Sequence, residues 1–212
     1  MYKVIGLLTI SFLPSILPAQ QPAKDSANNS SDSAWSFSAD SYYYLVPGGK
    51  NTLNLNVYAD HKALHTEMRY NYEDRNTASI FGGWKFETGN KVKLQATPMI
   101  GIAFGNTSGF APALEVELTY KIFDFYLESE YFVDFTGKKN DFLYTWTELG
   151  VSPCEAFRIG LTTESTRLYK TKLDIPRGFF GAYSFWKLTL GTYYFNPFSK
   201  RNYIVASCSI DF

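Results

Sequence analysis

The sequence predicts an all-β protein: an antiparallel, up-and-down transmembrane β-barrel of about twelve strands. Three observations predict this fold. Apolar and polar residues alternate with a period of two along most of the chain after residue 34, as they do in strands with one apolar and one polar face. Aromatic residues make up 18% of the chain, with 18 Phe and 16 Tyr, whereas charged residues still make up 19%. No later stretch is apolar over the roughly 18 residues that indicate a membrane helix.

The charge balance and the cysteines exclude several classes of protein. Lys and Arg together number 20, as do Asp and Glu, so the formal net charge is zero. A nucleic-acid partner would normally demand a basic surface, and we expect none here. Cys154 and Cys208 lie far apart in the sequence, which predicts two unpaired thiols or at most one incidental bridge, and no cysteine metal site.

Residues 1–20 have the pattern of a secretory signal peptide. Lys3 supplies a positive start, the run 4–17 is apolar, and Ala19 stands near a plausible cleavage point. A retained anchor is the alternative, but the run is shorter than the roughly 20 residues that a spanning helix needs. Residues 21–33 are rich in Gln, Asn and Ser and predict a flexible polar leader. The barrel is therefore assigned to residues 34–212.

Twelve alternating segments follow, each about the length of a membrane strand and separated by turn residues. If the amino terminus is periplasmic, the longer connections all lie at the outer end, as is usual in bacterial barrels. These predicted outer connections are 46–50, 72–76, 105–109, 136–141, 165–177 and 196–202. An even number of strands also returns the carboxyl terminus to the periplasm.

Alternating strands also build water-soluble sandwiches and lipocalin-like barrels, in which the apolar face points inward. Three features favour the membrane barrel, with lipid outside, and one of them is the terminal Phe212. The polar face carries many charges, which suit a water-filled or salt-bridged lumen. Aromatic residues gather near the predicted strand ends, as they do in the girdles of membrane barrels.

The polar face also supplies the candidate residues of the lumen. They are Arg69, Lys93, Glu115, Glu117, Glu128, Glu130 and Arg158. Like charges directly opposite one another destabilise a sheet. We therefore expect cations, protonation or basic side chains such as Lys93 or Arg69 to compensate the glutamates.

The hairpin around residues 121–124 brings these glutamates together. Folding it there places Glu117 near Glu128 and Glu115 near Glu130. Two hypotheses remain open for this acidic cluster: a cation-preferring constriction or binding site, and a plug of salt bridges that closes a narrow pore.

The last segment, 203–212, has apolar residues at every second position and ends in Phe212. With the signal peptide and the alternating strands, it resembles bacterial outer-membrane β-barrel proteins of the porin-like kind, in a Bacteroidota-like style. The resemblance implies an outer-membrane location and recognition by the barrel-assembly machinery, with Tyr203, Ile210 and Phe212 as the signal. It covers residues 35–212, is architectural, and assigns no functional residues.

The first functional hypothesis is a porin-like channel for passive diffusion of small solutes through outer-membrane lipid. The alternative is a non-conducting barrel for structure, adhesion or partner docking, and a distant third is a lipid-active enzyme. His61 and His65 fall at the predicted periplasmic end, which is the wrong place for a hydrolase acting on outer-leaflet lipid. We therefore expect no catalytic residues, no metal site and no cofactor.

Overall fold

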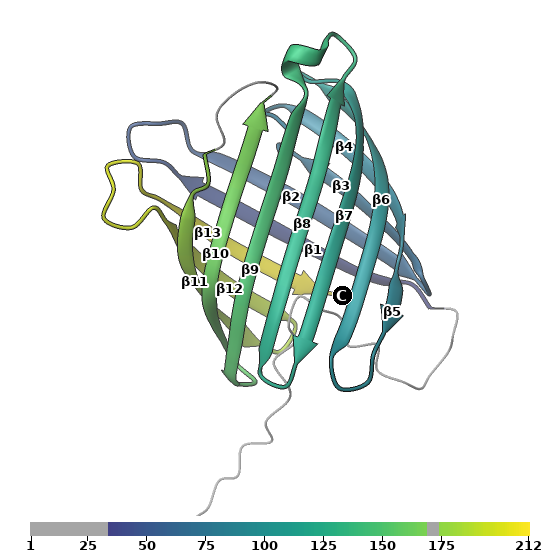
Figure 1. Ribbon diagram of the computed structural model, residues 1–212, viewed down its shortest axis with the longest axis vertical. Coiled ribbons are helices and arrows are strands. Elements are labelled where there is room, and N and C mark those ends of the chain that lie inside the picture. The colour runs from purple at the N-terminus through teal and green to yellow at the C-terminus, as the bar shows by residue number, and fades with distance from the viewer. Residues whose placement is uncertain (1–33, 169–173) are drawn as a thin grey trace, which may run out of the picture.

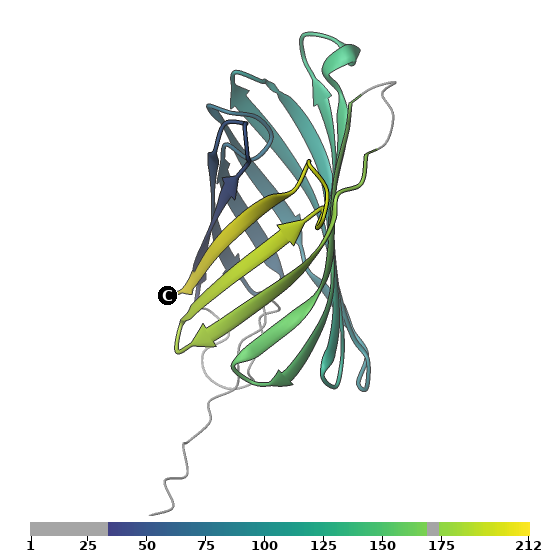
Figure 2. The ribbon, with the colours of Figure 1, turned by 90° about the vertical axis from the view of Figure 1, so that its left-hand side faces the viewer.

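The strands of this chain close into one antiparallel barrel (Figures 1 and 2). The structure is a computed structural model, and it describes residues 34–168 and 174–212. Sequence neighbours pair along the sheet, while β1 pairs with β13 and β4 pairs with β6 to complete the ring. The elements are β1 (Ser36–Leu45), β2 (Thr52–His61), β3 (Leu64–Tyr70), β4 (Thr77–Trp84), β5 (Phe86–Thr88), β6 (Lys93–Gly105), β7 (Gly109–Tyr120), β8 (Phe123–Asp134), η1 (Lys138–Asn140), β9 (Phe142–Cys154), β10 (Phe157–Leu168), β11 (Arg177–Phe185), β12 (Leu188–Phe195) and β13 (Tyr203–Asp211).

β4 and β5 are two parts of one barrel strand. Both pair with β6 in the same register, with Gly83 opposite Met99 and Phe86 opposite Ala96. Between them the N–H of Lys85 donates to a carbonyl in the neighbouring turn, 2.8 Å away. Counted in this way the barrel has twelve strands, which confirms the predicted fold class and strand number. No helix in the described part of the chain is long and apolar enough to cross a membrane.

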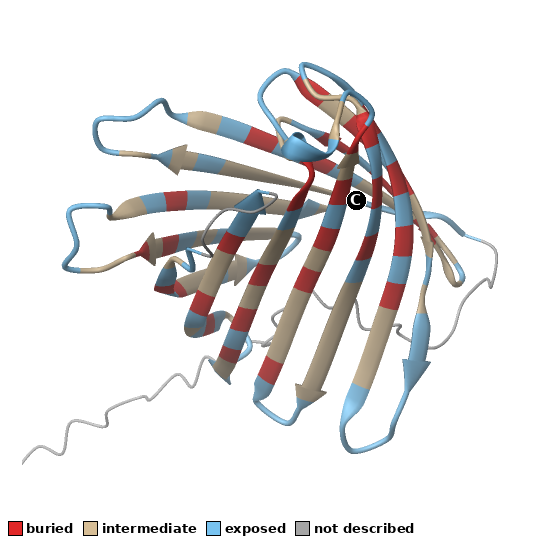
Figure 3. Ribbon diagram, turned by 45° about the horizontal axis from the view of Figure 1, so that its top comes forward, coloured by how far each residue is buried: buried red, intermediate tan, exposed pale blue. Residues whose placement is uncertain are grey.

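The apolar face of the barrel lies outside, and burial alternates along most of the strands (Figure 3). In β6, Ile100 and Ile102 are 57% and 52% exposed on the outer surface, whereas the intervening positions point inward. Exposed Ile, Leu and Phe side chains occur on nearly every strand of the outer surface. Soluble monomers rarely expose such a large contiguous apolar area. This surface matches the lipid-facing band of a membrane barrel, with the polar residues inside.

The two ends of the barrel differ, as predicted. At one end, called here the turn end, the connections are short: 62–63, 89–92, 121–122, 155–156 and 186–187. At the other, the loop end, most are longer: 46–51, 71–76, 106–108, 135–141, 169–176 and 196–202 (Figure 1). The connection expected at 165–177 begins later, because β10 pairs with β9 as far as Leu168. The predicted signal peptide and leader, residues 1–33, and residues 169–173 lie outside the described residues.

The β7–β8 hairpin corrects the predicted register of the glutamates. Tyr120 pairs with Phe123 around the two-residue turn 121–122, in which Lys121 has φ 56°. Two-residue turns with a residue at positive φ match the twist of antiparallel strands. The chain therefore turns at 121–122, whereas the prediction folded it about residues 121–124. The pairs directly opposite one another are Glu115 with Glu128, Glu117 with Tyr126, and Ala113 with Glu130. The predicted pairing was wrong by two residues.

Because Lys121 has a positive φ, two substitutions at this position should change the free energy of unfolding differently. We expect Lys121→Val to lower the free energy of unfolding by about 1–2 kcal/mol, because a β-branched residue is strained at positive φ. Lys121→Gly should leave it unchanged or raise it slightly. Urea unfolding in lipid vesicles, followed by tryptophan fluorescence, measures both. Equal stability of the two variants would contradict the turn geometry.

Candidate functional site

A buried network around Arg69 spans the inside of the barrel. From β3, the Nε of Arg69 donates to Glu67 at 2.5 Å. The Nη1 of the same side chain donates to Glu128 at 2.9 Å and Glu130 at 3.2 Å on β8. Because β4, β6 and β7 separate these strands in the wall, the bonds cross the lumen rather than follow the sheet. The network therefore ties two sides of the barrel together.

Aromatic rings hold the Arg69 guanidinium on two sides. Its carbon lies 4.5 Å from the centre of the Tyr72 ring and 4.3 Å from that of Phe81. The hydroxyl of Tyr72 also donates to Glu128 at 2.6 Å. The period-two alternation would place Tyr72 on the outer face with the exposed Tyr70, but Tyr72 follows the end of β3 and turns inward. Arg69 is thus paired, stacked and only 3% exposed, as a buried charge requires.

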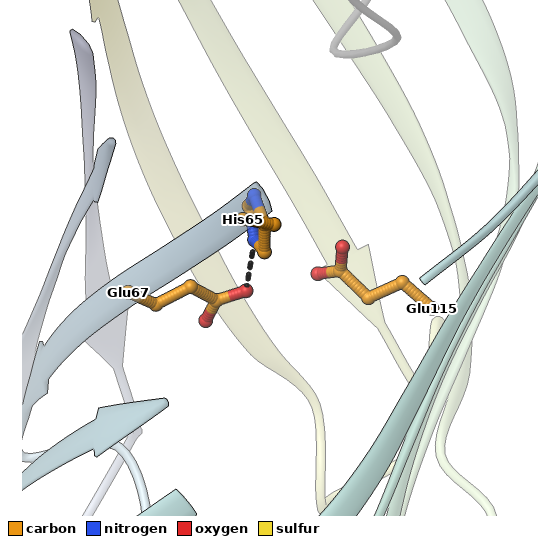
Figure 4. A group of neighbouring side chains, drawn as sticks. All are labelled: His65, Glu67 and Glu115. Atoms are coloured by element: carbon orange, nitrogen blue, oxygen red, sulfur yellow. Dashed lines mark hydrogen bonds and ion pairs between the residues drawn. The ribbon is translucent and has the colours of Figure 1, made fainter. Parts of the chain in front are cut away.

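His65 lies beside this network, nearer the turn end (Figure 4). Its Nδ1 is 2.6 Å from Asp60 and its Nε2 is 2.7 Å from Glu67. Ionised carboxylates only accept hydrogen bonds, so this geometry fits an imidazolium that donates to both. Lys85 also contacts Asp60, at 2.9 Å.

His65, Glu67 and Glu115 form the one potential metal-ligand set found among the described residues. Their ligand atoms all lie within 4.8 Å of one another, and Glu115 reaches toward the other two from β7, across the lumen (Figure 4). The sequence predicted no such group, because it joins side chains from two distant strands. The protein itself already binds both nitrogens of His65 and both oxygens of Glu67. A metal ion would have to displace these partners.

Arg158 forms a second network along the wall of the barrel. It donates from Nε to Asp124 at 2.9 Å and from Nη1 to Glu148. Asp124 is on β8 and Arg158 is on β10, so the pair reaches over β9 between them. Gly150 of β9 makes this possible, because a Cβ there would lie 2.5 Å from a carboxylate oxygen of Asp124. Arg158 also stacks on Phe180, 4.5 Å from its ring centre.

Aromatic side chains fill the lumen toward the loop end. Glu164 of β10 accepts hydrogen bonds from Tyr44 of β1 at 3.3 Å and from Tyr203 of β13 at 2.6 Å, and β11 and β12 separate β10 from β13 in the wall. Tyr203 stacks on Phe195, with ring centres 4.8 Å apart. Two buried clusters complete this closure: Phe81, Met99, Ala103, Ala111, Ala113, Phe132 and Phe142, and Trp146, Phe180, Tyr193, Phe195 and Val205. The loop-end part of the lumen is therefore packed.

A cavity of about 520 Å³ occupies the lumen between this closure and the turn end. At the turn end it is bordered by Lys62 and Lys187, and toward the loop end by Tyr44, Tyr72 and Tyr144. Glu115 and Glu117 project into it from β7. Many of the charged residues of the lumen line this cavity.

The structure places six of the seven predicted lumen residues inside the barrel and brings them into three groups. Arg69, Glu128 and Glu130 form one network, Arg158 belongs to another, and Glu115 and Glu117 line the cavity. Lys93 differs, since it is exposed at the turn-end start of β6 and does not line the cavity. Arg69 pairs with Glu67, Glu128 and Glu130, as expected of a basic side chain on this face. Of the proposed assembly residues, Tyr203 packs inside and Ile210 is exposed, whereas the exposed Phe212 borders the cavity.

Sequence reasoning missed several residues of these networks: Asp60, His65, Glu67, Lys85, Asp124 and Glu148. Most of them were assigned correctly to the polar face, so the period-two alternation carried the signal. It could not show which of them meet across the lumen. Only closure of the barrel brings β3 opposite β7 and β8.

Comparisons with known proteins agree with the geometry. No family model matches the chain, and no curated protein matches its sequence. The solved structure of the KdgM porin is similar in fold, with a TM-score of 0.61 over 82% of this chain and 99% of that one, at 12% sequence identity. The NanC porin is similar with a TM-score of 0.58, 10% identity, and coverage of 82% and 98%. This chain has the fold of these porins.

A third similar structure is KdgM in complex with disordered oligogalacturonate, again with a TM-score of 0.61 at 12% identity. At this identity the likeness describes the backbone. The side chains of the lumen must be interpreted from this chain alone.

Proposed function

We propose that this protein is a porin-like channel of the bacterial outer membrane that passes small solutes and prefers cations. The observation that carries the proposal is a closed barrel with an apolar outer surface and a cavity rich in carboxylates inside. The apolar outer face of the barrel suits contact with lipid, and the charged inner face suits a water-filled lumen. The loop end would face the cell exterior and the turn end the periplasm.

The charge of the lumen supports the choice of solute. Oligogalacturonate, the ligand named for the KdgM complex, is a polyanion. Here the cavity presents carboxylates as its most frequent charged groups, so it would repel such a chain. A cation, in contrast, is attracted to a constriction lined by acidic side chains.

A non-conducting barrel is the second candidate, and one specific observation favours it. The bonds of Arg69 and Glu164 cross the lumen, and Phe195 and Phe132 are fully buried at the loop end. If this closure is permanent, the barrel would serve structure, adhesion or docking instead of passage.

Conductance in planar lipid bilayers separates the two candidates. We expect the purified protein to give small, discrete conductance steps, with a reversal potential in a KCl gradient that indicates K⁺ over Cl⁻. Phe195→Ala should raise the single-channel conductance, because it removes a ring that closes the loop end. Phe198→Ala is the matched control, since Phe198 lies in the 196–202 loop and is 99% exposed. Absence of steps in the wild type and in Phe195→Ala would support the non-conducting barrel.

A further inference from the structure

The cavity combines an excess of acid with aromatic walls. Eight Asp and Glu residues line it, against four Lys and Arg residues and His65. Seven tyrosines and Trp146 also line it. Anionic groups and aromatic faces both attract positively charged organic groups. The lining is therefore that of a site for an organic cation.

Two of the four basic side chains that line the cavity already form ion pairs with Asp60, Asp124 or Glu148. Lys85 contacts Asp60 at 2.9 Å. Arg158 pairs with Asp124 and Glu148. The other two basic residues of the lining, at positions 62 and 187, lie in turns at the mouth of the cavity.

Glu115 and Glu117 remain without an ion pair in the described part of the chain. Glu115 accepts a hydrogen bond from the hydroxyl of Tyr126 at 2.9 Å. The nearby His65 lies between two other carboxylates, which share its charge. Glu115 and Glu117 are two residues apart on one face of β7, so their backbone positions are separated by about 6.8 Å. This spacing presents two negative charges side by side to the cavity.

An independent observation also indicates a missing hydrogen-bond donor in this cavity. Asn56 lines it, is only 4% exposed, and has an Oδ1 atom without a partner among the described residues. Its Nδ2 donates to the hydroxyl of Tyr58 at 3.1 Å. A buried carbonyl oxygen left without a donor is costly. An ammonium group would supply that donor, whereas an anion would not.

We infer that this cavity binds small aliphatic amines, and diamines most tightly, with Glu115 and Glu117 as the paired counter-charges. The inference rests on the proposed function, because it names the class of solute that the channel admits. A four-carbon diamine carries two positive charges at a separation close to that of the two glutamates. The tyrosine rings would cover its methylene chain and contact its ammonium groups.

Titration calorimetry with putrescine, on the purified full-length protein in detergent micelles at low salt, tests the inference. We expect saturable binding that the double variant Glu115→Gln, Glu117→Gln weakens at least tenfold. Glu155→Gln is the matched control, because Glu155 lies exposed in the 155–156 turn and does not line the cavity. Butan-1-ol, of the same length and without charge, should not bind, and butylamine should bind more weakly than putrescine. Retention of the folded band in unheated gels verifies that each variant keeps its barrel.

Equal binding of putrescine to the wild type and the double variant would overturn the inference, as would binding of butan-1-ol as tight as that of putrescine. Calorimetry does not require conduction, so the two proposals fail separately. A barrel that binds putrescine and does not conduct keeps the amine site and loses the channel. A barrel that conducts K⁺ and does not bind putrescine keeps the channel and loses the amine site.

Discussion

Replacing Arg69 with Met is expected to lower the free energy of unfolding by about 3–5 kcal/mol, because it leaves buried carboxylates without their counter-charge. Arg69 donates to Glu67, Glu128 and Glu130, all of them buried. Urea unfolding of the barrel in lipid vesicles, followed by tryptophan fluorescence, measures the loss.

Arg201→Met is the control for this experiment. Arg201 pairs with Asp174 at 3.2 Å, but both side chains are largely exposed, so its loss should cost at most about 1 kcal/mol. Adding Glu67→Gln and Glu128→Gln to Arg69→Met should recover part of the stability, because the unpaired charges are then removed. Equal stability of Arg69→Met and Arg201→Met would show that the cross-lumen network does not stabilise the barrel.

The second large effect concerns the outer surface. We expect Leu149→Arg to destabilise the barrel in lipid by about 2–4 kcal/mol, because it places a charge on the lipid face near the bilayer midplane. Leu149 lies near the middle of β9 and is 54% exposed on the outer face.

Leu143→Arg is the depth control, since Leu143 faces outward one residue from the loop-end start of the same strand. A charge near the interface costs about 0–1 kcal/mol. The same unfolding measurement in lipid vesicles compares the two variants. If Leu149→Arg and Leu143→Arg were equally stable, the outer face of β9 would not lie in the bilayer core.

The hairpin register shows where local pattern stops being sufficient. Alternation assigned Glu115, Glu117 and Glu128 to the same face, and the structure keeps them there. Which of them lie opposite one another depends on where the hairpin folds, and both the predicted and the observed fold positions preserve the alternation. A shift of two residues leaves every side chain on its face, so the hydrophobic pattern cannot detect it.

The networks of the lumen show the same limit at longer range. Arg69 was a reasonable partner for the glutamates because it shares their face. Lys93 shares that face too, yet it lies exposed at the start of β6 and does not reach the cavity. Arg69 and Lys93 differ in their position along the barrel axis. That position depends on how the strands tilt and stagger when the sheet closes.

The sequence by itself predicted an antiparallel barrel of about twelve strands and favoured an apolar face on the outside, and the structure confirms both. The sequence could do so because the side-chain period of a strand is local and repeats in every segment. Only the tertiary structure decided that Arg69 bridges to β8, that Gly150 makes room for Arg158 to reach Asp124, and that aromatic rings fill the loop end. Those contacts join residues that are distant in sequence, and closure of the barrel alone brings them within bonding distance.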